Sequence, residues 1–542
     1  MSEYGKVAGT RSTPQTEPIP GSSQVANSAG GFTWAVSKWD RLMRFLVLGA
    51  EGGTYYIGQR QLIKENAQAV MDCAAEDAER TVNILIDVAE TGRAPKAIPT
   101  IFALAMLCGH KDMRTRQLAL AAVPRVCRIG THLFNFLADI EKFRGWGRSL
   151  RRAVGSWYLT KDPRALAYQI TKYQQRDGET HRDALRRSHP AAKDDSVNEV
   201  LRYAVGKLDV PGEWLGSDFP HRTLLAAVES AKRVETEPEI LHLIERHNLV
   251  RECIPTKWLN SKKVWGALLE RMPMTAMIRN LGKMTSIGLL SPMSDTAKKV
   301  VSVLESQEAL HKSHIHPFNV LLALTTYNMG HGVRGKLTWS PVPQVSDALD
   351  GAFMASFPNV VPTNKNWYLG IDISGSMHSA IANTHISQSM AAAAMAMVAA
   401  RTEPWFCAYG FSSRSGGWGA RDVGMVDMGI TKQKQLSTIM SGTPRWTGGS
   451  TDCSLPFQHA LENNLPVDVF AVYTDNETYA GTPHPAQALQ EYREKTGRPA
   501  KLIVVGMAAN EFSIADPNDA GMLDVVGFDA SAPTVMADFA RD

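Results

Sequence analysis

Apolar residues from about residue 34 to about residue 349 recur at the spacing of amphipathic helices. Those within 82–89 occupy positions i, i+3, i+4 and i+7, and those within 240–244 follow much the same pattern. Glycine and proline interrupt the pattern at short intervals, so many helices of modest length are expected. About 300 residues of short helices exceed what one bundle core can bury. We therefore predict helix pairs stacked as a solenoid of the HEAT or armadillo kind, although no clean sequence repeat accompanies the pattern.

Polar residues mark two of the predicted helix starts. Thr236 and Glu239 have the spacing of a capping box, in which each side chain accepts a hydrogen bond from the other residue's backbone amide. Ser196 and Glu199 have the same spacing and predict the start of a second helix.

From about residue 360, short continuous apolar runs alternate with helical segments. Strands are predicted at 367–373, 405–411, 467–473 and 502–505, and helices at 379–401, 432–440, 452–463 and 484–495. This alternation predicts an α/β fold with a parallel, doubly wound sheet, whose ligands lie outside the carboxyl ends of the strands. Asp372 and Asp475 lie at or just after two of these strands, so both carboxylates are expected at one ligand site.

The first 31 residues differ in composition from the rest of the chain. They are rich in Gly, Ser, Pro, Thr and Gln and carry few large apolar side chains. Such a segment cannot bury enough surface to offset its chain entropy, so a disordered tail is predicted. The predicted division is a tail (1–31), an α-helical repeat domain (32–358) and an α/β domain (359–542).

The turn after the first predicted strand of the α/β domain reads Asp372-x-Ser374-x-Ser376. One carboxylate and two hydroxyls on a tight turn are hard oxygen ligands, which suit a small divalent cation such as Mg²⁺. The turn has no thiolate or imidazole, so it is not a zinc site. The alternative is that Ser374 and Ser376 merely cap the helix that follows.

Two further loops, 448–453 and 473–478, complete the predicted metal site. The predicted ligands are side chains with oxygen donors, namely Asp372, Ser374, Ser376, Thr451 and Asp475. The hydroxyls would bind the metal directly or nearly so, and the two carboxylates would balance its charge, often through water. A coordination position stays open for an acidic side chain or a phosphate of a partner. Asp452 and Glu477 are neighbouring alternatives as ligands.

Charge is distributed unevenly along the 542 residues, whose net charge is only +4. Residues 351–542 hold 12 basic and 18 acidic residues, so the first 350 residues have a net charge of +10. The segment 141–193 alone holds 13 basic and 5 acidic residues. Such a concentration favours a polyanionic partner, for which nucleic acid is the usual example. A solvated face of a helical domain would explain it about as well.

The six cysteines are scattered, with no CxxC pair, and indicate neither a disulfide framework nor a zinc module. A reducing compartment is the simpler interpretation. The sequence shows no secretory signal and no apolar run long enough to span a bilayer. We therefore expect a cytoplasmic protein that does not associate with membranes.

Three residues of the basic segment have a spacing or context that suits RNA binding. Lys172 and Arg176 are four residues apart, so on a helix they would share one face and meet neighbouring phosphates. His189 precedes a proline and is expected at a helix end, where it could bond to RNA or stack on it. A solvated face for the first two and a structural role for His189 remain alternatives.

The tract from Lys142 to Arg152 mixes several cations with one aromatic residue, Trp146. This combination is typical of surfaces that track single-stranded nucleic acid by stacking. Trp146 fits a packed core equally well.

Several segments resemble the Ro (SS-A) ribonucleoprotein family, whose helical part is called the TROVE domain. The segment 165–190 looks like its Y RNA-binding region, and 321–339 is similar to the end of its helical ring. The runs 473–481 and 514–517 resemble its von Willebrand A domain. In such domains Asp-x-Ser-x-Ser opens a metal-ion-dependent adhesion site. The resemblance extends from about residue 32 to the C-terminus, in the same domain order.

This resemblance implies a ring of HEAT-like repeats closed by the A domain. It implies that an outer basic face binds Y RNA-like small RNAs, and that 3′ ends of misfolded RNAs enter a positively charged central hole. Lys172, Arg176 and His189 match family residues implicated in RNA binding. The candidate RNA-binding residues are the basic side chains Lys142, Arg144, Arg148, Arg151, Lys172, Arg176, His181, Arg186, Arg187 and His189.

A non-catalytic RNA-binding protein that serves RNA quality control is therefore expected, with a nuclease or other protein as a partner of the A domain. The alternative is a protein-adhesion scaffold that acts through the metal of its A domain. A metal-dependent hydrolase would need a second metal, a P-loop or a nucleophile with a paired base, and the sequence shows none of these. Cys453 and His459, six residues apart, do not share a helix face well.

Overall fold

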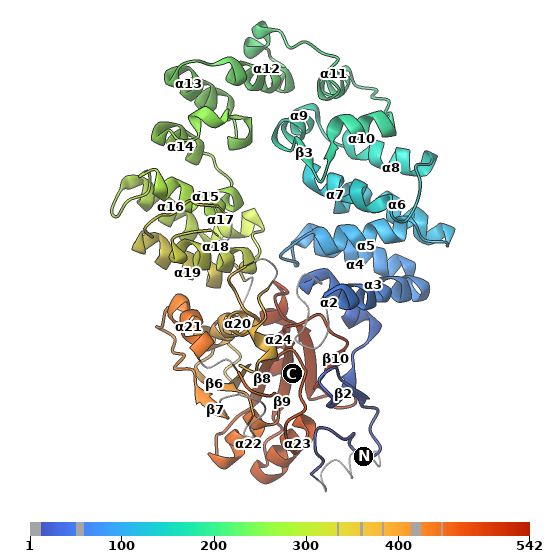
Figure 1. The fold of residues 1–542 in the computed structure, drawn as a ribbon, viewed down its shortest axis with the longest axis vertical. Helices are drawn as coiled ribbons and strands as arrows, with labels where there is room; N and C mark the ends of the chain where they lie inside the picture. The colour runs from blue at the N-terminus through green and yellow to red at the C-terminus, as the bar shows by residue number, and fades with distance from the viewer. Residues whose placement is uncertain are drawn as a thin grey trace.

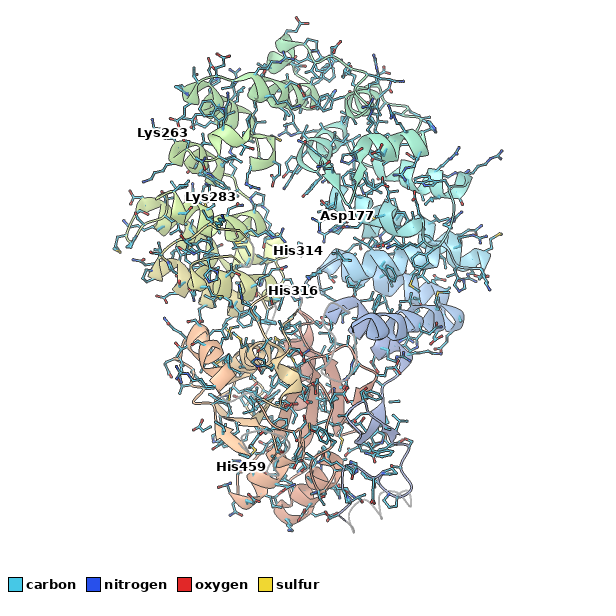
Figure 2. The ribbon with its side chains drawn as sticks, in the orientation of Figure 1. Asp177, Lys263, Lys283, His314, His316 and His459 are labelled. Atoms are coloured by element: carbon cyan, nitrogen blue, oxygen red, sulfur yellow. The ribbon has the colours of Figure 1, made fainter. Side chains whose placement is uncertain are left out.

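The structure is a computed structural model. It describes residues 12–49, 59–332, 335–357, 361–381, 384–413, 424–445 and 448–542, with the backbone alone for 59–66. Figure 1 shows a ring of helices that is closed by an α/β domain. The side chains drawn in Figure 2 leave the centre of the ring clear, and Asp177 and His314 are labelled at its edge. Across the described ranges, no helix has both the length and the apolar character that crossing a membrane would need.

The helices of the ring follow one another in chain order around the centre. Several pack on the helix two places along, as α4 does on α6, α5 on α7 and α6 on α8, which confirms the predicted repeat architecture. Their bounds are α2 (Lys38–Leu48), α3 (Gln59–Glu76), α4 (Ala78–Thr91), α5 (Ile98–Cys108), α6 (Met113–Val126), α7 (Gly130–Ile140), α8 (Arg148–Leu159), α9 (Pro163–Lys172), α10 (His181–Ser188), α11 (Asp195–Ala204), α12 (Pro220–Arg233), α13 (Glu237–His247), α14 (Lys262–Leu269), α15 (Met274–Ser286), α16 (Asp295–Glu305), α17 (Gln307–Ser313), α18 (Pro317–Met329) and α19 (Pro343–Ala355). Short elements between them are β3 (Gln175–Arg176), β4 (Glu179–Thr180), η1 (Gly212–Gly216), η2 (Arg251–Cys253) and η3 (Thr256–Trp258).

The predicted apolar face of 82–89 is buried in α4, but the predicted capping differs. Thr236 precedes α13, yet its side chain makes no capping hydrogen bond. Helix α11 is capped by Asp194, whose side chain accepts a hydrogen bond from Val197 N. A carboxylate at the N-cap also complements the helix dipole, so Asp194 takes the position that was predicted for Ser196.

Buried ion pairs attach the ring to the A domain. Arg44 of α2 is fully buried and donates to both carboxylate oxygens of Asp524, each at 2.8 Å. On the other arm, Arg401 of the A domain donates to Asp350 of α19 at 2.5 Å. Both ends of the ring are therefore fixed to the same domain.

The first helices, the last helices and the A domain meet at Arg93, in the connection after α4. The Arg93 side chain donates to Asp529 at 2.6 Å. Its backbone carbonyl lies 2.9 Å from Nε2 of His316, the residue that precedes α18, and also accepts from Ala530 N. This junction closes the ring (Figure 1).

The A domain contains a six-stranded sheet of order β11-β9-β8-β5-β6-β7. Its strands are β5 (Asn366–Asp372), β6 (Trp405–Phe411), β7 (Met425–Asp427), β8 (Val469–Thr474), β9 (Lys501–Gly506) and β11 (Met522–Val526). The helical elements are η4 (Ser376–His378), α20 (Gln388–Thr402), α21 (Leu436–Gly442), η5 (Thr443–Arg445), α22 (Leu455–Glu462), α23 (Pro485–Thr496) and α24 (Ala532–Arg541). Five strands are parallel, and β7 pairs antiparallel at the edge, so the sheet is mixed rather than wholly parallel.

Helix α20 begins nine residues later than the predicted start at 379. Ser387 caps it by accepting a hydrogen bond from Met390 N at 3.1 Å. The alanine-rich part of α20 is buried against β5, because small side chains let a helix approach a sheet closely. Ser374 and Ser376 do not cap this helix, which removes the alternative explanation for the Asp372 turn.

The prediction of a disordered tail is wrong for residues 12–31; residues 1–11 lie outside the described ranges. Strand β1 (Val25–Ala26) pairs with β2 (Phe32–Ala35), which in turn pairs with β10 (Phe512–Ser513) of the A domain. Gln15 is fully buried and donates to Asp452 at 2.8 Å. Composition predicts disorder by counting apolar surface, whereas this segment, which we call the strap (residues 12–35), is held largely by polar contacts.

Candidate functional site

The predicted metal ligands lie where the sheet places them, at the carboxyl ends of neighbouring strands. Asp372 ends β5, and Asp475 follows β8 directly. One oxygen of Asp372 accepts from Ser374 N at 2.9 Å, and the other accepts from the Thr474 hydroxyl at 2.6 Å. The hydroxyls of Ser374 and Ser376 are 3.1 Å apart.

The glycine-rich loop is attached to the Asp372 turn through backbone hydrogen bonds. Gly375 N donates to Gly449 O at 3.0 Å, and Gly448 N donates to Ile373 O at 2.7 Å. Cys453 N, which follows on the same loop, donates to the Thr478 hydroxyl at 3.0 Å. The three loops therefore meet. Each of the five predicted ligands is at most 3 % exposed: Asp372, Ser374, Ser376, Thr451 and Asp475.

Burial raises the pKa values of both carboxylates in this cluster. It raises the pKa of Asp372, and the neighbouring charge of Asp475 raises it further. Burial also raises the pKa of Asp475, whose Oδ2 accepts no hydrogen bond from the described residues. No three His, Cys, Asp or Glu side chains in the described ranges converge as a metal site, so the hydroxyls would have to act as ligands. This donor set suits a hard divalent cation.

The alternative ligands Asp452 and Glu477 make contacts with the strap. Asp452 Oδ1 accepts from Gln15 Nε2 and from both the backbone and the hydroxyl of Ser454. Glu477 Oε2 accepts from Ala29 N at 3.1 Å. Burial and then the charge of Asp475 raise the pKa of Glu477 to about 8. The hydrogen bonds of Asp452 hold its carboxylate within the fold, whereas Glu477 Oε1, like Asp475 Oδ2, accepts no hydrogen bond from the described residues. We retain the five predicted residues, with Glu477 as the alternative ligand.

The candidate RNA-binding residues divide into exposed cations and cations that support the fold. Arg148 and Arg151 are exposed at the start of α8, as is the neighbouring Arg152. The first turn of α8 carries no acidic residue, so the positive end of its dipole and these cations would both favour an anion there. Arg186 is exposed in the last turn of α10, which packs beside α8.

Two other predicted cations, Arg144 and Arg187, are engaged within the protein. Arg144 donates to Cys108 O at 3.0 Å and to the Ser149 hydroxyl at 3.2 Å. Arg187 pairs with Glu141 and Glu179, and its guanidinium lies 4.9 Å from the centre of the Trp146 ring. Trp146 itself packs partly buried against the core. Lys142 remains largely exposed, with an ion pair to Asp139 at 2.6 Å.

Lys172 and Arg176 do not share a helix face, contrary to the prediction. Helix α9 ends at Lys172, and Arg176 lies in the short strand β3 on the inner side of the ring (Figure 1). Arg176 is exposed and lies 3.5 Å from Asp177, which Figure 2 labels at the edge of the opening. Gly178 turns the chain back with a φ of 81°, which a glycine tolerates. Helix α9 therefore places Lys172, and the hairpin that follows it, rather than a continuation of the helix, places Arg176.

The structure excludes a direct RNA contact for His181. Its ring is 3 % exposed, shares a 2.9 Å hydrogen bond with the Tyr158 hydroxyl and packs on Phe134. Burial lowers its pKa to about 4, so it is a neutral core residue. His189 does lie at a helix end as predicted: it is exposed, with a φ of 47°, at the C-terminus of α10.

Aromatic residues beside the cations were missed in the sequence. Lys172 Nζ donates to the Tyr168 hydroxyl at 2.9 Å and lies 5.2 Å from the ring centre of Tyr173. Farther along the ring, Arg222 lies 4.5 Å from the ring centre of Phe219, which is 49 % exposed. The spacing of Tyr168, four residues before Lys172 on one helix, could have predicted this contact.

Comparisons with known proteins cover nearly the whole chain. The family model of the TROVE domain matches residues 25–328, and that of the Ro60 vWA domain matches residues 366–540. The sequence is 40% identical over 532 residues to a Deinococcus radiodurans protein named RNA-binding protein RO60, with 97% of each chain covered. It is 35% identical over 589 residues to the Caenorhabditis elegans protein of the same name, covering 95% of this chain and 90% of that one.

A solved structure is also similar. The crystal structure of the Deinococcus radiodurans RO (RSR) protein matches with a TM-score of 0.66 and 38% sequence identity. The match covers 93% of this chain and 99% of the other. The likeness therefore extends over both the helical ring and the α/β domain.

Proposed function

This chain belongs to the Ro60 family of TROVE and von Willebrand A domain proteins, and we propose that it binds RNA. In this proposal the ring holds small structured RNAs of the Y RNA kind and captures the 3′ ends of misfolded RNAs for quality control. The observation that supports it most is the set of exposed arginines on α8 and α10. Arg148 and Arg151 lie at a helix start without an acidic residue, where an anion is favoured, and phosphates are the anions that RNA supplies.

The first test is to sequence the RNAs that co-purify with the full chain. Enrichment of one small structured RNA is expected, and absence of RNA would contradict the proposal. Binding of that RNA should weaken steeply with salt, because phosphate contacts release counterions. A triple variant, Arg148→Ala with Arg151→Ala and Arg186→Ala, should lose affinity and show a shallower salt dependence. Replacing Arg144, which is bonded within the protein, serves as the matched control.

We further propose that the A domain binds a divalent cation, with Mg²⁺ as the first candidate. The hydroxyls of Ser374, Ser376 and Thr451 would be direct ligands, and Asp372 and Asp475 would balance the charge. The buried Asp475 Oδ2 without a hydrogen bond supports a cation at this place. When bound, the cation supplies a Lewis-acidic position that an acidic side chain or a phosphate of a partner can fill.

Calorimetric titration of the full chain with Mg²⁺ and Mn²⁺ tests the metal directly. Wild type should bind one ion, and Asp475→Asn should bind it far more weakly. Asp452→Asn, which changes a carboxylate already held by Gln15 and Ser454, should retain binding. Equal binding by wild type and Asp475→Asn would show that the ion lies elsewhere.

The alternative function, a protein-adhesion scaffold, uses the same metal loops. A nuclease or other protein with an exposed carboxylate would be captured only in the presence of the cation. Pull-down with wild type and Asp372→Asn, each with RNA binding measured in parallel, separates this function from RNA binding. Both functions are compatible with one chain, because the ring cations and the metal loops are separate groups of residues.

A binding protein is proposed here rather than an enzyme. Burial raises the pKa of Cys453 well above its usual range, so this thiol is not an activated nucleophile. His459 (Figure 2) shares a 3.0 Å hydrogen bond with the Tyr368 hydroxyl. All six cysteines are free thiols, which supports the proposal of a reducing, cytoplasmic environment.

A further inference from the structure

A cavity of about 410 Å³ lies in the half of the ring away from the A domain. It is lined by α9 on one arm of the ring and by α13, α14 and α15 on the other, with η2 between them (Figure 1). This volume falls within the usual range for small-ligand sites. Helices from both arms therefore meet around a space that side chains leave open.

One wall of the cavity combines an aromatic ring with a positioned cation. Lys172 Nζ is held by the Tyr168 hydroxyl and lies 5.1 Å from the centre of the Tyr168 ring. Burial lowers the pKa of Lys172, but the hydrogen bond to Tyr168 and nearby negative charge outweigh it and raise the pKa overall. The lysine is therefore charged, half-buried and next to an aromatic ring that lines the same space.

The rest of the lining offers an amide on the opposite wall and several carboxylates. Asn280 of α15 donates its Nδ2 to Ala276 O at 2.7 Å, which leaves its Oδ1 as an acceptor. On the Lys172 side, Glu252 of η2 also lines the cavity and is one of the charges that raise the pKa of the lysine. Arg164, Arg251 and Arg271 add cations, and three glutamates balance most of this charge. The cavity is therefore suited to more than an anion, because it combines an aromatic ring with hydrogen-bond donors and acceptors.

We propose that this cavity receives one unpaired nucleotide of the bound RNA, with its base against Tyr168 and its phosphate near Lys172. The proposal rests on the RNA binding proposed above and adds to it a site for a single nucleotide. Stacking on an aromatic ring, hydrogen bonds to a base edge and one cation for the phosphate are what an extruded or single-stranded nucleotide needs. An unpaired nucleotide is favoured over a paired one because it enters without the cost of opening a duplex.

The position of Lys172 at the end of α9 suits this role. The arginines of α8, by contrast, are exposed. Lys172 is instead half-buried and fixed by Tyr168, so its position is defined before RNA arrives. A predefined position reduces the ordering cost of binding and favours recognition of one nucleotide.

The test uses an RNA hairpin with a single-stranded 3′ tail of about ten nucleotides. Each tail nucleotide is replaced in turn by an abasic one, and affinity for the full chain is measured. We expect one or two neighbouring positions to weaken binding about tenfold, the size of a lost stacking contact. A uniform, shallow profile would overturn the nucleotide site while leaving RNA binding intact. Failure of wild type to bind any RNA would contradict the proposed function itself.

A variant that fills the cavity gives the second measurement. Ala276→Trp, on the cavity face of α15, should weaken binding of the hairpin about tenfold and flatten the abasic profile. Ser286→Trp, exposed at the end of the same helix and outside the cavity, is the matched control and should change neither. Wild-type affinity and an unchanged profile for Ala276→Trp would overturn the proposal. If that variant does not fold, the profile of the wild type decides.

A free nucleotide is the competing source of the same chemistry. Nucleoside monophosphates, tested one by one for stabilisation of wild type and Ala276→Trp, distinguish it. Stabilisation of wild type together with a flat abasic profile would assign the cavity to free nucleotides and overturn the RNA assignment. Competition between a monophosphate and the hairpin tail, lost in Ala276→Trp, would support it.

Discussion

The ring and the A domain place their candidate functional groups in opposite environments. On α8 of the ring, Arg148, Arg151 and Arg152 are exposed cations. In the A domain, Asp372 and Asp475 are fully buried, and their pKa values are raised by burial. The ring therefore offers charge to a large external polyanion, whereas the A domain concentrates unbalanced charge at one internal point.

This difference separates affinity from stability. An exposed cation is solvated in the free protein, so its removal affects binding and little else. A buried charge is costly to the folded state unless its partners compensate it. A change near it therefore alters the free energy of unfolding. Mutations of the two regions should therefore be distinguishable by unfolding measurements alone.

The largest effect is expected at the buried ion pair that joins the two regions. Arg44→Ala leaves Asp524 without its bidentate partner and removes donors to Asn510 and Phe512. Breaking a buried pair of this kind costs about 3–5 kcal/mol. Urea unfolding of Arg44→Ala and of the exposed control Arg152→Ala, expected within about 0.5 kcal/mol of wild type, measures the contrast. Similar losses in both variants would refute the division into buried and exposed charges.

The next effect is a pH dependence of opposite sign in the two regions. His181 of the ring has a pKa of about 4 in the fold, below its ordinary value, so its contribution is present above about pH 6.5 and lost as pH falls towards 4. Its full size is about 3 kcal/mol. Glu477 of the A domain has a pKa of about 8 in the fold, above its ordinary value. Its contribution to stability is therefore present below about pH 4.5 and lost as pH rises towards 8.

Hydrogen exchange of peptides from α8–α10 and from β8, in EDTA at pH 5 and pH 8, tests these signs. After correction for the intrinsic exchange rate, the ring should be better protected at pH 8 and the A domain at pH 5. His181→Phe should flatten the response of the ring without altering that of β8. A shift of both regions in the same direction would contradict the assignment.

Periodicity was sufficient to predict most of this architecture. Strand β6 has the predicted bounds, and β5, β8 and β9 differ from theirs by one or two residues at each end. The short edge strand β7 was missed because three residues carry too little pattern. The strap was misassigned because Gln15 and Asn27 are buried by hydrogen bonds to the A domain, which no local composition reveals.

The functional residues were predictable to the extent that local sequence determines them. The Asp372 turn carries its chemistry within five residues, so its geometry could be anticipated. The Lys172–Arg176 pair failed because a helix was assumed to continue, whereas the chain turns at Gly178. Burial of His181 depends on Tyr158 and Phe134 from other helices, and a basic segment of sequence does not show which of its members face inward.

Metal binding should compensate the buried negative charge of the A domain and so stabilise its folded state. A cation at a free concentration of about one hundred times its Kd stabilises the folded state by about 2.7 kcal/mol. We expect this gain for wild type with Mg²⁺ and none for Asp372→Asn, measured by thermal unfolding with and without EDTA. In EDTA the variant should be at least as stable as wild type, because one buried like charge is removed. An undiminished Mg²⁺ response in Asp372→Asn would place the ion elsewhere.

The smallest effect compares two arginines of the ring that carry the same charge. Arg151 is exposed on α8, and no hydrogen bond or ion pair of its side chain is found in the described part of the chain, whereas Arg144 donates to Cys108 O and to Ser149. Arg151→Ala should leave unfolding unchanged and lower the slope of log K against log salt by about 1 in RNA binding. Arg144→Ala should instead lose about 1–3 kcal/mol of stability with little change in slope, because an acceptor inside the fold is left unpaired. Identical salt slopes for the two variants would mean that exposure does not decide which cations meet RNA, and the contrast between the regions would then rest on the A domain alone.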